Sequence, residues 1–135
     1  MRKHVLVLLF FFACFSKSSG QNPEIEIKKI ETIFKGYVDR VESMDSDENK
    51  AQMKNALMSL QVQRAENHFP ILIDVWMYYD PTDFPTRELI EPILQKNKSA
   101  ALLAIGTRLK NKRASESLEN APYIDLINFR QKLLE

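Results

Sequence analysis

The chain has 135 residues, with 19 lysine and arginine residues against 18 aspartate and glutamate residues. A formal net charge of +1 gives no support for binding to nucleic acid or to an anionic membrane surface, because both favour a strongly basic protein surface. The single cysteine excludes an intramolecular disulfide, so the core alone has to stabilise the fold. The length is sufficient for one domain with such a core.

The first twenty residues have the order of a secretory signal peptide. Two basic residues come first, an apolar run follows from Val5 to Phe15, and small polar residues follow up to Gly20. This apolar run is too short for a membrane-spanning helix, which needs ~20 residues. We therefore predict a cleaved signal peptide at residues 1–20 and a single mature domain at residues 21–135, secreted or periplasmic.

A lipoprotein signal is the alternative for the same segment. Phe11-Phe12-Ala13-Cys14 resembles a bacterial lipobox, with a small residue before the cysteine but phenylalanine where leucine is usual. On this route the signal ends at Ala13, and a lipid on Cys14 tethers the protein to the membrane. On the soluble route, cleavage removes three basic residues and leaves 16 basic against 18 acidic residues, a formal charge of −2.

The N-terminal part of the mature chain predicts two helices. Apolar residues recur at spacings of three and four over residues 24–44. A polar break at 43–49 follows, in which Ser46 or Asp47 can cap a second helix that runs to about Glu66. Because the connection is short, we expect an antiparallel hairpin. The predicted inward stripe of the first helix is Ile27, Ile30, Phe34, Val38 and Val41, and Met53, Leu57, Leu60 and Arg64 are predicted to share one side of the second.

Residues 69–79 form the most apolar segment of the mature chain, and their periodicity fits either a strand or a helix. Pro70 suits the first turn of a helix. No second strand-like run is present, and a lone strand cannot satisfy its backbone hydrogen bonds. We therefore predict a buried helix.

A proline-rich turn follows and predicts a further helix. Thr82 or Asp83 can cap this helix, which runs from about Phe84 to Lys96. Pro92 lies inside it and predicts a kink or a break, because proline lacks the backbone N–H.

Two more helices complete the prediction. Ser99 can cap a helix that runs to about Lys112, and Pro122 opens the last helix after a polar loop. With five or six short helices and no paired strand pattern, the predicted fold class is all-α. The amphipathic helices and proline turn of residues 69–134 resemble HEAT-type helical repeats. The predicted architecture is a compact bundle or a short HEAT-like helical array.

Motifs for metals, cofactors and covalent catalysis are absent from the sequence. An acidic run at 45–49 has the alternation that opens a calcium-binding EF loop, but Lys50 replaces its glycine and Ala56 its bidentate glutamate. His68, the only histidine of the mature chain, fits a helix start better than a catalytic or metal-binding role. We therefore predict no metal and no cofactor, and we do not expect an enzyme.

The densest group of polar and aromatic residues surrounds the turn after the apolar segment. Asp74 lies within apolar sequence, where an unpaired charge is costly, and we predict that it lies on the exposed edge of its helix. The alternative is an ion pair between Asp74 and Arg87 across the turn. Trp76 and Phe84 are predicted inside and Tyr78 more exposed. The candidate partner surface consists of Tyr78, Asp80, Asp83, Arg87 and Glu88.

A basic stretch without acidic residues runs from Lys96 to Arg113. It can dock an acidic partner or a lipid surface, or complement the negative end of a helix. With no catalytic motif, we expect a non-catalytic protein that binds another envelope or secreted protein through a helical surface. The alternative is a small carboxylate-using hydrolase or a small-ligand binder, with a pocket that joins Asp74, Asp80, Asp83 and Glu88.

Overall fold

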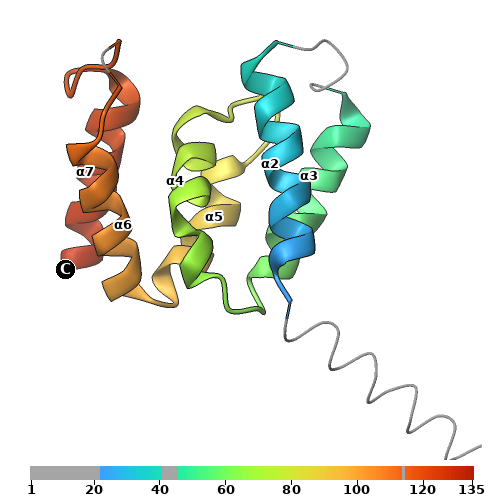
Figure 1. The fold of residues 1–135 in the computed structure, drawn as a ribbon, viewed down its shortest axis with the longest axis horizontal. Coiled ribbons are helices and arrows are strands. Elements are labelled where there is room, and N and C mark those ends of the chain that lie inside the picture. Colours follow the sequence, from blue (N-terminus) through green and yellow to red (C-terminus); the bar gives the residue numbers. More distant parts are fainter. Residues whose placement is uncertain (1–21, 41–45, 114) are drawn as a thin grey trace, which may run out of the picture.

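The computed structural model describes residues 22–40, 46–113 and 115–135 (Figure 1). The described residues form six α-helices, one short 3-10 helix and no strand, so the predicted all-α fold class is confirmed. The predicted signal segment, Cys14 included, lies outside the described residues. In chain order the elements are α2 (Glu24–Val38), α3 (Asp47–Leu60), η2 (Glu66–His68), α4 (Phe69–Tyr78), α5 (Thr86–Gln95), α6 (Lys98–Lys110) and α7 (Ala121–Leu134).

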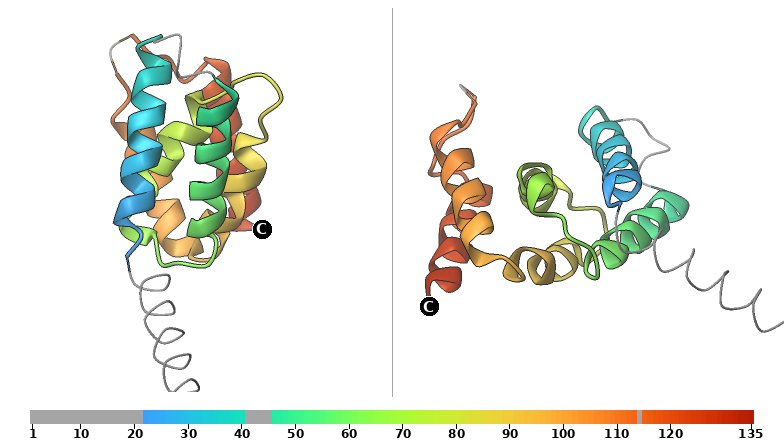
Figure 2. Two further views of the ribbon diagram at one scale, coloured as in Figure 1. Left: turned by 90° about the vertical axis from the view of Figure 1, so that its right-hand side faces the viewer. Right: turned by 60° about the horizontal axis from the view of Figure 1, so that its bottom comes forward.

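The helices alternate in direction along the chain and form three antiparallel hairpins, α2–α3, α4–α5 and α6–α7 (Figure 1). α4 is central, because it contacts α2, α5, α6 and α7. α3 packs against α5, and α5 packs against α6. The turned views show the other helices curving around α4 (Figure 2). The predicted first hairpin is therefore present.

α4 is buried because nearly all of its side chains are apolar. Leu72 and Ile73 have no exposed surface, and Trp76 is 4% exposed. Pro70 lies in the first turn, where a missing N–H breaks no intrahelical hydrogen bond. The prediction of a buried helix rather than a strand at residues 69–79 is confirmed.

α2 ends earlier than the periodicity predicts. Its last helical residue is Val38, and Arg40 adopts a positive φ of 58°, a left-handed conformation that ends a helix. Val38 is consequently 49% exposed instead of facing inward, and Ile33 is buried. The predicted inward residue Val41 lies outside the described residues.

α3 begins as predicted but ends earlier. The side chain of Ser46 accepts a hydrogen bond from the backbone N–H of Asn49 at 3.2 Å, which confirms the predicted N-cap. The helix ends at Leu60 rather than near Glu66, because the chain turns there toward η2 and α4. Arg64, predicted to share a side of this helix with Leu57 and Leu60, therefore lies beyond its end, and the Arg64 side chain is 93% exposed.

α5 begins without the predicted side-chain cap. Asp83 adopts a positive φ of 57° in the preceding turn, and the helix starts three residues later at Thr86. The Thr86 hydroxyl instead donates a hydrogen bond to the carbonyl of Tyr79 at 2.7 Å, which holds the start of α5 against the end of α4. The helix continues unbroken through Pro92, whose ring lies on the exposed side.

The cap of α6 is Asn97 rather than the predicted Ser99. The Asn97 side-chain oxygen accepts a hydrogen bond from the backbone N–H of Ala100 at 3.1 Å. We expect Asn97→Ala to lower the free energy of unfolding by about 0.5–2 kcal/mol, the usual value for a lost N-cap. Ser99→Ala, at an exposed position inside the helix, should have little effect in the same urea titration. A larger loss for Ser99→Ala would contradict this assignment.

Candidate functional site

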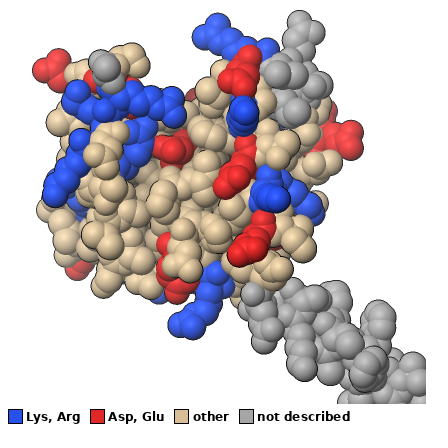
Figure 3. All heavy atoms as spheres, viewed as in Figure 1, with Lys and Arg blue, Asp and Glu red and all other residues tan. Residues whose placement is uncertain are grey.

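An open groove with a volume of about 1180 Å³ lies over α4, between α2 and the connection from α6 to α7. Its α2 wall and its α4 floor carry half-buried aromatic and aliphatic side chains, whereas the α6–α7 wall is polar. Figure 3 views this side of the molecule and shows basic residues gathered over the α6–α7 end, with acidic and basic residues alternating along α2. The residues that define the groove include Phe34, Tyr37 and Val38 of α2, Ile71, Asp74 and Tyr78 of α4, and Arg108, Arg113 and Glu116.

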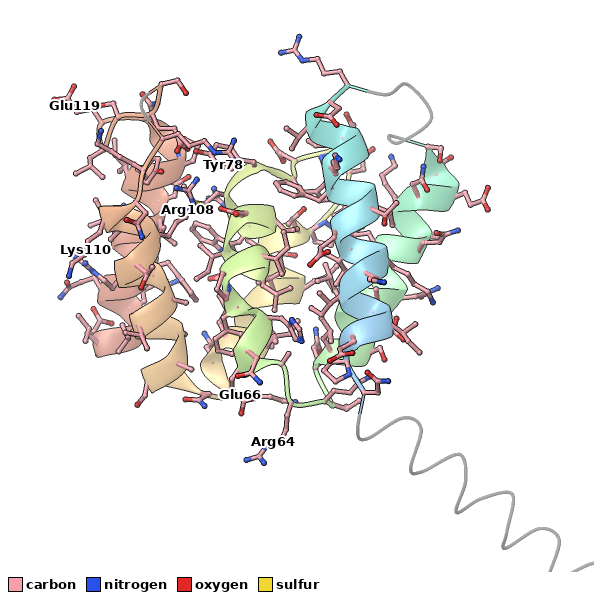
Figure 4. All side chains as sticks on the ribbon, in the orientation of Figure 1. Arg64, Glu66, Tyr78, Arg108, Lys110 and Glu119 are labelled. Atoms are coloured by element: carbon pink, nitrogen blue, oxygen red, sulfur yellow. The ribbon has the colours of Figure 1, made fainter. Side chains whose placement is uncertain are left out.

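Arg108 connects the floor of the groove to its polar wall. Its Nε donates to Asp74 Oδ1 at 2.7 Å, and its Nη2 lies 3.2 Å from Glu116 Oε2. Its Nη1 donates to the Tyr123 hydroxyl at 2.7 Å. The Arg108 side chain is only 13% exposed, so one buried cation joins α4, α6, the α6–α7 connection and α7. Figure 4 shows Arg108 of α6 and Tyr78 of α4 close to one another.

Glu116 is the main acceptor of this cluster. The hydroxyl groups of Tyr78 and Tyr123 both donate to its carboxylate, the latter at 2.9 Å. The backbone N–H of Arg113 donates to it at 2.7 Å, and a turn closed by the Glu116 N–H to the Arg113 carbonyl brings these residues together. With its side chain 11% exposed, Glu116 fixes the α6–α7 connection against α4.

The hydrogen bonds set the protonation states within the cluster. Burial alone raises the pKa of Glu116, but hydrogen bonds from Tyr78, the Arg113 backbone and Tyr123, with the charge of Arg108, lower this pKa to about 2. Burial and the neighbouring Glu116 carboxylate raise the pKa of both tyrosines. Glu116 therefore stays charged and both phenols stay neutral near pH 7. Such a carboxylate is a poor proton acceptor at that pH, and the cluster is suited to holding the wall of the groove in place.

The lowered pKa of Glu116 predicts a loss of stability in acid. A depressed carboxyl pKa contributes stability that is present above the unfolded-state pKa of 4.5 and is lost as the pH falls toward the folded-state value of about 2. We expect the free energy of unfolding, measured by urea titration, to fall from about pH 5 to about pH 2. Glu116→Gln should flatten this fall, whereas the exposed Glu119→Gln should not. Equal slopes for both variants would contradict the prediction.

Asp74 pairs with Arg108 and not with Arg87, the alternative partner across the turn. Arg87 instead contacts Asp125 of α7 at 2.8 Å and lies over the Trp76 ring, 4.0 Å from its centroid. The two arginines face opposite sides of α4, because Asp74 points into the groove and Trp76 lies on the side that packs against α7. Asp74, at 29% exposure, is partly covered rather than fully exposed on a helix edge.

A second, smaller cavity of about 440 Å³ lies at the α4–α5 turn, next to the start of α7. The structure brings Asp80, Arg87 and Glu88 of the candidate partner surface together around it. Tyr78 lies in the groove instead, and Asp83 lines neither the groove nor this cavity. The candidate surface is thus divided between two places.

The carboxylates of the alternative prediction are divided in the same way. Asp74 lines the groove, while Asp80 and Glu88 line the cavity at the turn, so the predicted pocket that joins them is not formed. Trp76 is buried as predicted, and Phe84 is half-buried. His68 lies half-buried in η2. Within the described ranges, no group of three or more histidine, cysteine, aspartate or glutamate residues could hold a metal ion.

In the part of the chain that the structure describes, none of the helices combines the length and apolar character needed to cross a membrane. No protein-family model, no curated protein and no solved structure matches the chain.

Proposed function

We propose that the chain is a non-catalytic interaction module that binds a segment of another protein in the groove over α4. The observation that supports this proposal is the size and lining of the groove. Its volume of about 1180 Å³ exceeds the ~300–1,000 Å³ usual for small-molecule pockets. Half-buried Phe34, Tyr37, Ile71 and Tyr78 lie beside charged groups, the mixture typical of an interface with an apolar centre and a polar rim.

The arrangement of the helices also supports an interaction role. The alternating directions of α2 to α7 are consistent with a short HEAT-like array of three hairpins. Arrays of this kind bind partners on extended concave surfaces. A cleaved secretory signal or a lipid on Cys14 would place the groove outside the cytoplasm. The proposed partner is therefore another envelope or secreted protein.

Two matched substitutions test whether the groove binds the partner. Val38 lines the groove and Met58 of α3 does not, although both side chains belong to residues that are 49% exposed. We expect native mass spectra of protein purified gently from the cells that make it to show a bound polypeptide for the wild type and for Met58→Glu. Val38→Glu should lose this polypeptide, because a charge then replaces an apolar contact in the groove.

Three results would count against the proposal. A polypeptide retained equally by both variants would place the interface elsewhere, and loss from Met58→Glu alone would place it on α3. Wild-type protein that carries no polypeptide would contradict an interaction module. Each variant should also give the wild-type thermal transition, so that a lost partner is not confused with a lost fold.

A second candidate function is binding of a small molecule at the α4–α5 turn. The cavity there, about 440 Å³, falls within the usual range for such ligands and has Asp80, Arg87 and Glu88 at its surface. This candidate predicts a small adduct in the same native spectra. The adduct should be kept by Val38→Glu and lost by Glu88→Gln.

A further inference from the structure

We infer that the bound segment carries acidic side chains where it meets the α6–α7 connection and apolar side chains where it crosses α2 and α4. This inference rests on the proposed function, because it specifies the chemistry of the partner at the same groove. It follows from the distribution of exposed charge and apolar surface around the groove.

The exposed charge of the α6–α7 wall is positive. Arg113 is exposed and lines the groove, whereas Lys110, Lys112 and Glu119 are exposed but do not line it. Figure 3 shows the basic side chains gathered at this end. The other two carboxylates of the wall and floor, Asp74 and Glu116, are already bound by Arg108 and are mostly covered. A partner in the groove therefore meets the cation of Arg113 at this wall.

The helix dipole explains only part of this basic group. Arg108 and Lys110 lie in the last turn of α6, where positive charge complements the negative helix end. Lys112 and Arg113 lie beyond the C-cap residue Asn111, and the dipole effect falls off within the last turn. Lys112 Nζ donates to the backbone carbonyl of Glu116 at 3.4 Å, so of the two charges beyond the cap only that of Arg113 is left for a partner.

Arg113 is the residue placed to bind a carboxylate of the partner. It lines the groove, and its guanidinium forms no ion pair with another described residue. A guanidinium presents a planar set of donors that matches a carboxylate with two parallel hydrogen bonds. Its backbone N–H already bonds to Glu116, so the position of Arg113 in the wall is fixed.

The opposite wall decides between a protein segment and a polyanion. Glu31, Lys35, Asp39 and Arg40 line the groove from the α2 side, with equal numbers of both signs. A nucleic acid or an anionic lipid surface would bring negative charge against Glu31 and Asp39 as well as against Arg113. A peptide segment can place carboxylates at one end only and apolar side chains elsewhere. The apolar part would lie over Phe34, Val38 and Ile71.

A displayed library of random peptides, selected on the purified chain, tests the inference with a defined probe. We expect the enriched peptides to combine an apolar stretch with acidic residues at one end. For a synthetic peptide of this class, Arg113→Glu should raise the Kd about tenfold or more, since hydrogen bonds to a charged group are lost. Arg64→Glu is the control, because Arg64 is 93% exposed and lies outside the groove.

The outcomes separate this inference from the proposed function. If Val38→Glu abolishes peptide binding but the selected peptides are not enriched in acidic residues, the groove is a binding site and the inference is wrong. The same holds if Val38→Glu abolishes binding and Arg113→Glu leaves the Kd unchanged. Equal weakening by Arg64→Glu would show a general charge effect and would also overturn the inference. Peptides that bind Val38→Glu as tightly as the wild type, or no enrichment at all, would contradict the proposed function itself.

Discussion

Arg108→Met should lower the free energy of unfolding by about 3–5 kcal/mol, the usual cost of removing one partner from a buried ion pair. The substitution leaves Asp74 and Glu116 without their cation and the Tyr123 hydroxyl without its donor. The methionine side chain is apolar and flexible, so the change removes the charge while filling most of the space. Urea titration at neutral pH measures the effect.

Arg87→Met is the matched control for this experiment. Arg87 also forms an ion pair between two helices, but its side chain is 39% exposed and that of Asp125 is 43% exposed. Exposed pairs contribute only about 0–1 kcal/mol, and methionine can keep much of the contact with Trp76. Similar losses for Arg87→Met and Arg108→Met would contradict the central place that we assign to the Arg108 cluster.

Leu72→Ala should lower the free energy of unfolding by about 2–5 kcal/mol, because it leaves a cavity in the centre of the core. Leu72 has no exposed surface and belongs to α4, which packs against α2, α5, α6 and α7. Leu103→Ala removes the same atoms from a residue of α6 that is 74% exposed, and should change stability by less than about 0.5 kcal/mol. The two urea titrations can be compared directly, and equal losses would contradict the described packing of α4.

The sequence predicts the elements of this fold better than their ends. Residues 69–79 could be assigned to a helix because Pro70 suits a first turn and no strand was available to pair with. The ends of the helices depend on backbone conformations that the spacing of apolar residues does not indicate. Arg40 and Asp83 adopt positive φ values, which end α2 and delay the start of α5, and neither is a glycine that would have indicated this.

The candidate site was predicted only in part, because its contacts join residues far apart in the chain. The apolar sequence around Asp74 indicates that its charge needs a partner or solvent, but nothing in the sequence connects it to Arg108, which is 34 residues away. Glu116 gave one signal, as the first acidic residue after the basic stretch. Its contacts with Tyr78 and Tyr123 depend on how the α6–α7 hairpin packs on α4. The sequence pattern does not predict this packing.

Photo-crosslinking in the cells that make the protein tests directly whether a polypeptide lies in the groove. A benzophenone amino acid replaces Val38 in the groove or, in a second strain, the equally exposed Met58 on α3. We expect a covalent polypeptide adduct at position 38 and not at position 58, with a crosslinked peptide that combines an apolar stretch with acidic residues at one end. An adduct at position 58 alone, or no adduct at position 38, would contradict binding in the groove.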